Sequence, residues 1–351
     1  MKKSLPVVNV LTDFFNLYLP TAKGLSHNTI TSYEYAFQLL FEYVNDEKQI
    51  PPESVSFQSL SNGTVLDYLN WLETNRQCST RTRNQRLAAI SSFAKYAMKQ
   101  KFSEALTFGS EVINIPKKKV PKNDDVVYFT IKEIEIILGL PNNLTKIGNR
   151  DMVLLSVLYA SGARAQELCD LTVNDIHFGE KTSLRLVGKG NKSRSVIITD
   201  ECAELLKSYL QNSPMTTSQM KSRASHIFSS QTHEHMTVSC VEGIVKKYMT
   251  IAKAAHPKLF KCKSYSPHSF RHSIAVHMLE SDIPLPVIKN FLGHASIQST
   301  LVYAKVTPEL ANKYLREKGF GASLPKNSET TTPRTTLLPF LDKISKRNRS
   351  G

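Results

Sequence analysis

The sequence lacks any long hydrophobic run. Its most apolar stretch is the nine residues from Met152 to Ala160, whereas a membrane-spanning helix needs about 20. The first residues are also too polar for a signal peptide, because Asn9, Thr12 and Asp13 interrupt any apolar region there. We therefore expect neither a membrane protein nor a secreted one.

Cysteine is scarce and shows no pairing pattern. The chain has five cysteines, and no two of them form a Cys-x-x-Cys pair. This pattern is not that of a disulfide-stapled fold, and it favours reduced thiols in a cytosolic protein. One group of side chains, His226, His233, His235 and Cys240, matches no standard zinc-ligand spacing, so no metal site is predicted.

Acidic residues are the minority charge. The chain has 45 Lys and Arg against 30 Asp and Glu, a formal net charge of +15. Such an excess favours a polyanionic partner, either nucleic acid or an acidic membrane surface. The proportions of hydrophobic residues (41%) and charged residues (21%) are those of a folded protein, and a length of 351 residues favours two domains.

The pattern along the chain predicts four parts. Residues 1–113 show short amphipathic helices, and the clearest of them begins after Ser26 with apolar residues at spacings of three and four. Residues 114–127 contain two prolines and four lysines and predict a basic interdomain linker. We expect a second domain at 128–322 and a flexible tail at 323–351, where apolar residues are few.

The predicted fold class is mainly α with a small antiparallel β-sheet. Alternating apolar residues on either side of a Gly-Lys-Gly turn predict a β-hairpin at 183–198. Helical periodicity predicts the remaining elements, at 61–74, 79–100, 130–140, 149–161, 201–211, 238–253, 267–280, 286–292 and 299–304.

Two basic groups are candidates for contact with a polyanion. One opens the predicted helix 79–100, where cations oppose the helix dipole. Such a run either forms a solvated face, which is the commoner role, or contacts phosphates. The candidates are Arg81, Arg83 and Arg86 in the helix, with Lys117, Lys118, Lys119 and Lys122 in the linker.

Several polar residues stand at the predicted helix ends of the second domain. His268 and Arg271 are three residues apart near a helix start and share a face. Gly293 stands where a left-handed helix cap is usual, His294 follows it, and Tyr303 lies nine residues later. Taken singly, each of these residues has a commoner structural role.

Arg164 directly follows another predicted helix, and Glu167 lies three residues further on. By themselves the two would form an exposed ion pair that contributes roughly 0.2–0.5 kcal/mol to stability.

In their order along the chain, these motifs resemble the tyrosine recombinase family, the phage-integrase and Xer-like site-specific DNA recombinases. The resemblance runs from about Lys132 to Lys305, and the N-terminal helices look more loosely like that family's core-binding domain. Ser161 stands where the family commonly has Thr, and Phe270 where it usually has Leu, which leaves the chemistry intact. The resemblance implies one catalytic set: Arg164, Lys189, His268, Arg271, His294 and Tyr303.

The implied chemistry suits these residue types. The guanidinium groups of Arg164 and Arg271 would neutralise the charge that builds on the nonbridging oxygens of the phosphate, and His294 would hydrogen-bond it. Tyr303 would be the nucleophile and would lose its proton to His268 or to the phosphate itself. Lys189 would protonate the departing 5′ oxygen.

The resemblance implies a site-specific recombinase that cleaves and rejoins double-stranded DNA through a 3′-phosphotyrosyl intermediate, for integration, excision or transposition of a mobile element. We expect no cofactor, because no carboxylate cluster offers a two-metal site and the intermediate retains the bond energy. We also expect no small-molecule substrate and no membrane partner.

The expected assembly is a tetramer on DNA, to which the helix predicted at 309–318 would contribute by docking on a neighbouring subunit. The expected location is the cytoplasm, at the nucleoid. Two other functions stay open at this point: DNA relaxation of the type IB topoisomerase kind, and non-catalytic regulation by a DNA-binding protein of the same fold.

Overall fold

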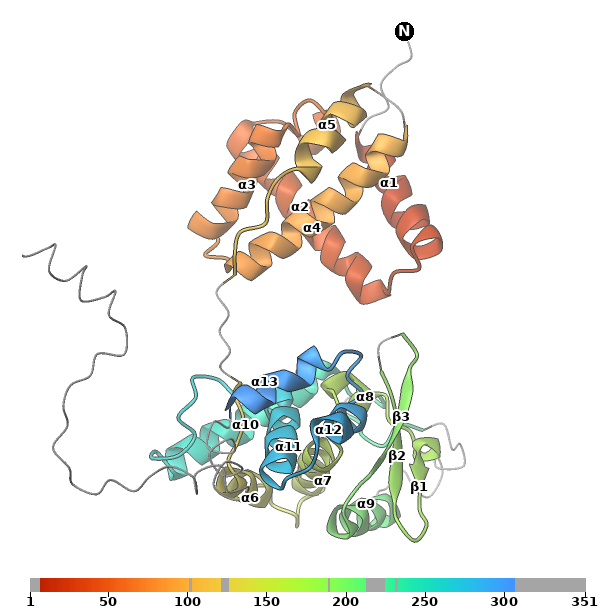
Figure 1. Ribbon diagram of the computed structural model, residues 1–351, viewed down its shortest axis with the longest axis vertical. Helices are drawn as coiled ribbons and strands as arrows, with labels where there is room; N and C mark the ends of the chain where they lie inside the picture. Colours follow the sequence, from red (N-terminus) through yellow and green to blue (C-terminus); the bar gives the residue numbers. More distant parts are fainter. Residues whose placement is uncertain are drawn as a thin grey trace, which may run out of the picture. The chain divides into compact units, whose positions relative to one another are not determined.

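The chain folds as two compact units, Met1–Asn123 and Asp124–Gly351 (Figure 1). The computed structural model describes residues 7–100, 103–120, 126–188, 190–212, 225–230 and 233–306. The predictions for Lys122, Lys189, the helix at 309–318 and the tail at 323–351 lie outside these residues. Within the described ranges, no helix is both long and apolar enough to cross a membrane.

The first unit is a bundle of helices. Its elements are α1 (Val7–Asp13), a π-helical segment (Phe14–Ala22), α2 (His27–Lys48), α3 (Asn62–Thr74), α4 (Thr80–Ala97) and α5 (Ser103–Ile113), with short 3-10 turns at Pro52–Ser54 and Met98–Gln100. Phe93 of α4 is fully buried and contacts the rings of Phe14, Phe37 and Phe108 at centroid distances of 5.3, 5.2 and 6.0 Å. Aromatic packing therefore forms the centre of this core.

The helix starts of this unit follow the sequence closely. The hydroxyls of Ser61 and Ser79 accept hydrogen bonds from the backbone N–H groups three residues on, which caps α3 and α4. By contrast, α5 has no counterpart among the predicted helices, because Gly109 interrupts its pattern. A Cβ at Gly109 would lie 2.1 Å from Cγ of Met98, so glycine allows the close approach of two segments at a cost in helix propensity of about 1 kcal/mol.

The second unit is mostly helical with one small sheet, which confirms the predicted fold class. Its helices are α6 (Ile131–Gly139), α7 (Lys146–Ser161), α8 (Ala165–Cys169), α9 (Asp200–Asn212), α10 (Val238–Ala255), α11 (Pro267–Glu280), α12 (Leu285–Leu292) and α13 (Gln298–Val306), with a 3-10 turn at Val173–Asp175. The five residues of α8 are too few to show a helical period in the sequence.

The sheet is antiparallel in the order β1 (Ile176–His177), β2 (Ser183–Val187) and β3 (Ser193–Ile197). Leu184 pairs with Val196 across the predicted hairpin, and both side chains are buried. A further strand, β1, was not predicted; it has two residues and pairs Ile176 with Leu184. The register places one apolar face of the hairpin in the core and so fixes where its turn projects.

Helix α11 lies in the middle of the second unit and packs against α7, α12 and α13 (Figure 1). Its side chains are buried on most sides, including Phe270, Ala275 and Val276. Because the C-terminal ends of α7 and α12 meet the first turns of α11, residues far apart in the sequence are brought to one place.

Candidate active site

Arg271 stands on the second turn of α11 and is almost fully buried, with 3% of its surface exposed. Its guanidinium donates hydrogen bonds to the carbonyl oxygens of Gly162 at 2.6 Å and Leu292 at 2.5 Å. These are the residues at the C-terminal ends of α7 and α12. Arg271 therefore joins two helix ends, where a cation is favoured by the helix dipoles.

Arg164 lies beside this junction, two residues after the left-handed glycine Gly162, which ends α7 at φ 57°. It occupies the N-cap position of α8, and its backbone N–H donates to Oε2 of Glu167 at 2.9 Å. Its Nη1 donates to Oε1 of the same carboxylate at 2.7 Å. The Arg164 side chain is 35% exposed, so its guanidinium is held by Glu167 and is still accessible to solvent.

Arg164 and Glu167 are not the exposed surface pair that their spacing alone suggests, because the Glu167 side chain is only 2% exposed. Arg194 of β3 donates two hydrogen bonds to Glu167, both at 2.9 Å. Burial raises the pKa of Glu167, but the hydrogen bonds from Arg194 and Arg164 outweigh it and lower that pKa to about 2. Glu167 is therefore an anion that positions two arginines.

Arg194 also fixes the end of α12. Its Nε donates to the carbonyl oxygen of Phe291 at 3.0 Å. Helix α12 is capped two residues later by Gly293, which has the left-handed conformation at φ 65°. A Cβ on this glycine would lie 2.8 Å from Cδ of Arg194. His294 follows, and its Nδ1 is hydrogen-bonded to Oγ1 of the buried Thr300 at 2.9 Å. The position of the imidazole is thus set by the backbone turn at Gly293 and by the hydrogen bond to Thr300.

Tyr303 is 1% exposed and lies among these residues. Its hydroxyl is hydrogen-bonded to Nδ1 of His272 at 3.0 Å. The ring of His294 stacks 6.3 Å from that of Tyr303, measured between centroids. Burial raises the pKa of Tyr303, and the charges of Arg271 and Arg164 act in the opposite direction.

The histidines of the site are held in the neutral form. Burial, followed by the charge of Arg271, lowers the pKa of His294 to about 4. Burial, followed by His268 and Arg271, lowers the pKa of His272 to about 4. The pKa of His268 is lowered as well, by partial desolvation and by Arg271. Burial, followed by the charges of Arg164 and Arg194, lowers the pKa of Arg271 to about 10, and Arg271 still carries a charge at neutral pH.

The structure therefore brings together five of the residues singled out in the sequence: Arg164, His268, Arg271, His294 and Tyr303. Lys189 lies outside the described residues. The preceding residue, Gly188, lies close to Glu167, because a Cβ on this glycine would be 2.9 Å from Oε1 of Glu167. Sequence reasoning did not identify His272, Arg194 or Thr300 as part of the site. For His272, the sequence offered one signal, namely its position directly after Arg271.

Within each of the two predicted DNA-contacting groups, the residues differ in their surroundings. Arg81, Lys117 and Lys119 are exposed. Arg83 is 3% exposed and donates to the carbonyl oxygen of Pro116 at 3.3 Å. Arg86 lies over the ring of Tyr35 at 4.8 Å, and Lys118 pairs with Glu73 at 2.5 Å.

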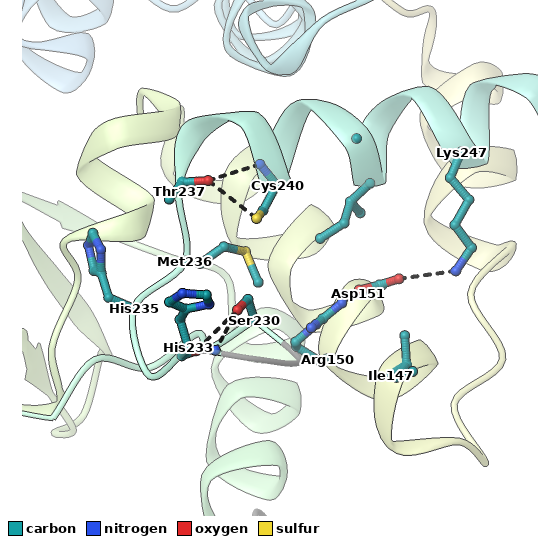
Figure 2. Close-up of a pocket in the computed structure, with 12 residues that line it drawn as sticks. Ile147, Arg150, Asp151, Ser230, His233, His235, Met236, Thr237, Cys240 and Lys247 are labelled. Carbon is teal, nitrogen blue, oxygen red and sulfur yellow. Dashed lines mark hydrogen bonds and ion pairs between the residues drawn. The ribbon is translucent and has the colours of Figure 1, made fainter.

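A cavity of about 730 Å³ lies between α7 and α10 and contains none of the predicted catalytic residues (Figure 2). Asp151 on its wall is paired with Arg150 at 2.7 Å and Lys247 at 3.3 Å. His233, His235 and Cys240 also line it. In the part of the chain that the structure describes, no three His, Cys, Asp or Glu side chains are grouped to hold a metal ion.

Comparison with known proteins identifies the relatives of this architecture. The sequence profile of the Phage integrase family matches residues 128–309, and that of the Phage integrase N-terminal SAM-like domain matches residues 12–101. The tyrosine recombinase XerD of Halalkalibacterium halodurans is 31% identical over 86% of this chain and 94% of that one. The tyrosine recombinase XerC of Myxococcus xanthus is 30% identical over 85% of this chain and 94% of that one.

A solved structure shows the same fold. The XerH site-specific recombinase, in a post-cleavage complex with its palindromic difH substrate, matches with a TM-score of 0.63 at 19% identity. The match covers 86% of this chain and 82% of that one.

Proposed function

The chain belongs to the phage integrase family of tyrosine recombinases, and from that premise we propose that it cleaves and rejoins specific sites in double-stranded DNA through a 3′-phosphotyrosyl intermediate on Tyr303. One observation carries the proposal, namely the gathering of a buried phenol and two arginines. The charges of Arg271 and Arg164 both act on the Tyr303 phenol. Two cations beside a phenol suit attack on a phosphodiester, because they can stabilise the negative charge that develops on the phosphate oxygens.

The two arginines would bind the scissile phosphate. A guanidinium has five N–H donors, and Arg271 directs hydrogen bonds to two backbone carbonyls, which leaves donors for phosphate oxygens. Arg164 is held by Glu167 and is 35% exposed. A fixed pair of forks can stabilise the charge of a pentavalent phosphorane without reorganising at the moment of reaction. His294, which is neutral, would donate a further hydrogen bond from Nε2 while Nδ1 faces Thr300.

In the cleavage step, Oη of Tyr303 would attack phosphorus, and the bond from phosphorus to the 5′ oxygen would break. The departing oxygen needs a proton, and we assign its delivery to Lys189. Support for this assignment comes from Gly188, which lies against the Arg164–Glu167 pair. A 5′ hydroxyl of a second strand would reverse the step, so that neither ATP nor a metal ion is required.

The biological role that we propose is integration, excision or transposition of a mobile element, acting on the nucleoid in the cytoplasm. We propose a tetramer as the active assembly, with the helix predicted at 309–318 as the contact between subunits. The exposed basic residues of the first unit, such as Arg81, Lys117 and Lys119, would contact the DNA backbone.

A test begins with the DNA site. The full chain is used to select its binding site from random duplexes, and cleavage is then followed on the selected duplex carrying a nick, from which the short 5′-hydroxyl fragment escapes. We expect the wild-type protein to accumulate a covalent protein–DNA adduct. Tyr303→Phe should bind the same duplex with unchanged affinity and form no adduct.

The matched control is Tyr159→Phe, which removes a phenol that is hydrogen-bonded to His277 at 2.8 Å in the same unit. It should leave adduct formation intact. An adduct formed by Tyr303→Phe, or none formed by the wild type on its selected site, would overturn the proposal. Relaxation of a supercoiled plasmid that lacks the selected site would point instead to a topoisomerase.

A further inference from the structure

His272 stands beside the nucleophile, in a position that the sequence analysis left without a role. It is half-buried on α11, one residue after Arg271. Its Nδ1 lies 3.0 Å from the hydroxyl oxygen of Tyr303, and the two rings are 5.6 Å apart between centroids. This is the contact distance that a proton acceptor for the phenol requires.

The surroundings of His272 keep its imidazole able to accept a proton. Its neighbours are His268 and Arg271 on α11, Tyr303 on α13 and His294 between α12 and α13. Burial and the nearby positive charges disfavour protonation, and the pKa of His272 is lowered to about 4. At neutral pH one ring nitrogen therefore carries a lone pair.

His268, which the sequence analysis gave together with the phosphate itself as a possible proton acceptor, is placed differently. It is exposed, and its ring lies 6.3 Å from that of His272. The charges of Arg271 and Arg164, the proposed phosphate ligands, both act on His268. The hydrogen bond to the Tyr303 hydroxyl is made by His272, at 3.0 Å.

We propose that His272 is the general base that takes the phenolic proton of Tyr303, an inference that rests on the proposed function. The Oη–H of Tyr303 donates to Nδ1 of His272, with the imidazole proton on Nε2. As the Oη–P bond forms and the bond from phosphorus to the 5′ oxygen breaks, the phenolic proton passes to Nδ1, and the general acid protonates the 5′ oxygen. In the reverse step the imidazolium returns its proton to Oη.

The charge balance of this step is favourable in the assembled complex. Taken alone, an imidazolium next to Arg271 would be repelled. The phosphorane that forms at the same moment carries additional negative charge beside both cations, which offsets this repulsion. Proton transfer is therefore coupled to attack on phosphorus, and the phenol stays protonated while no DNA is bound.

The experiment compares His272→Ala with His272→Asn on the selected nicked duplex. The Asn side chain has an amide oxygen that can accept the hydrogen bond from Tyr303 but is not a base. If His272 is the base, single-turnover cleavage should fall by about 10²-fold or more in both variants. DNA affinity should stay at the wild-type value in both variants, and thermal stability should stay there in His272→Asn, which keeps an acceptor for the Tyr303 hydroxyl. His256→Ala, at the C-terminal cap of α10, is the matched control and should cleave normally.

Two further readouts separate proton transfer from positioning. In both His272 variants, cleavage should rise about tenfold per pH unit toward the pKa of Tyr303, because the phenolate must then form by itself. Difluorotyrosine incorporated at position 303, with a more acidic phenol, should restore most of the rate lost in His272→Ala.

Cleavage by His272→Ala within about threefold of wild type would overturn the inference, as would full activity of His272→Asn with an unchanged pH profile. Neither result touches the proposed function, which depends on the wild-type adduct and on its loss in Tyr303→Phe.

Discussion

At the scale of single residues, the site depends on Glu167. We assign this residue no contact with the reacting groups, which are the Tyr303 hydroxyl and the DNA phosphate. Its carboxylate receives Arg164 at 2.7 Å and Arg194 at 2.9 Å, and its side chain is 2% exposed. A buried anion with two cationic partners orients both of them at once. Because Arg194 is only 11% exposed, loss of the anion would leave a charge without its partner in the interior.

We expect Glu167→Gln to lower the free energy of unfolding by about 3 kcal/mol, which is the scale for breaking a buried ion pair from one side, and to reduce cleavage as well. The measurement is urea unfolding of the full chain together with cleavage of the selected duplex. Glu204→Gln, on the exposed surface of α9, should leave both unchanged. A loss below 0.5 kcal/mol for Glu167→Gln, roughly that of an exposed pair, would contradict the assignment.

The difference in unfolding free energy between the wild type and Glu167→Gln should depend on pH in a definite direction. The pKa of Glu167 is lowered from 4.5 to about 2 on folding. Its contribution to stability is therefore fully present above about pH 4.5 and is lost as the pH falls toward 2. The stability gap between the wild type and Glu167→Gln should narrow over that window, and a gap that widens there would contradict this account.

At the scale of elements, the C-terminal end of α12 is the part of the second unit on which the site converges. Its last carbonyls accept hydrogen bonds from Arg194 and Arg271. Gly293 turns the chain from there toward His294. Two features of the structure require glycine at position 293. Its φ is positive, and a Cβ there would lie only 2.8 Å from Cδ of Arg194.

Gly293→Ala and Gly24→Ala separate these two reasons. Both glycines have positive φ, of 65° and 57°, but a Cβ on Gly24 would meet nothing within 4 Å. Both substitutions should cost roughly 1–2 kcal/mol through the left-handed backbone. Gly293→Ala should in addition displace Arg194 and reduce cleavage at least tenfold. Equal cleavage by the two variants would show that the contact with Arg194 does not position His294.

At the scale of the whole molecule, the net charge of +15 divides into groups with different surroundings. Arg164, Arg194 and Arg271 are committed to one site in the second unit. In the first unit, Arg83 is buried and Lys118 is paired with Glu73. Lys117 and Lys119 are exposed, and they are among the residues that we propose contact the DNA backbone.

If each of these lysines neutralises one phosphate, the double variant Lys117→Gln/Lys119→Gln should reduce the slope of log affinity against log salt by about two. The loss should be the same for specific and random duplexes, because phosphate contacts carry no sequence information. Lys207→Gln, an exposed residue of α9, is the control. An unchanged slope in the double variant would remove the linker from the DNA interface.

The sequence was most informative where local rules act. Helix starts at Ser61 and Ser79, the hairpin around Gly188 and the span of α11 all follow from capping and periodicity. It did not reveal the role of Glu167, since an i,i+3 pair looks the same whether buried or exposed. Its burial depends on Arg194, 27 residues away. The contact of His272 with Tyr303 spans 31 residues and likewise depends on tertiary packing.

The central claim is that Tyr303 becomes covalently joined to DNA, and mapping of the adduct tests it most directly. The wild-type protein is trapped on its selected nicked duplex, digested with protease and nuclease, and the modified peptide is identified by mass spectrometry. The account predicts a nucleotide attached through a 3′ phosphate to Tyr303. A modification on any other residue, or a linkage to a 5′ phosphate, would contradict it.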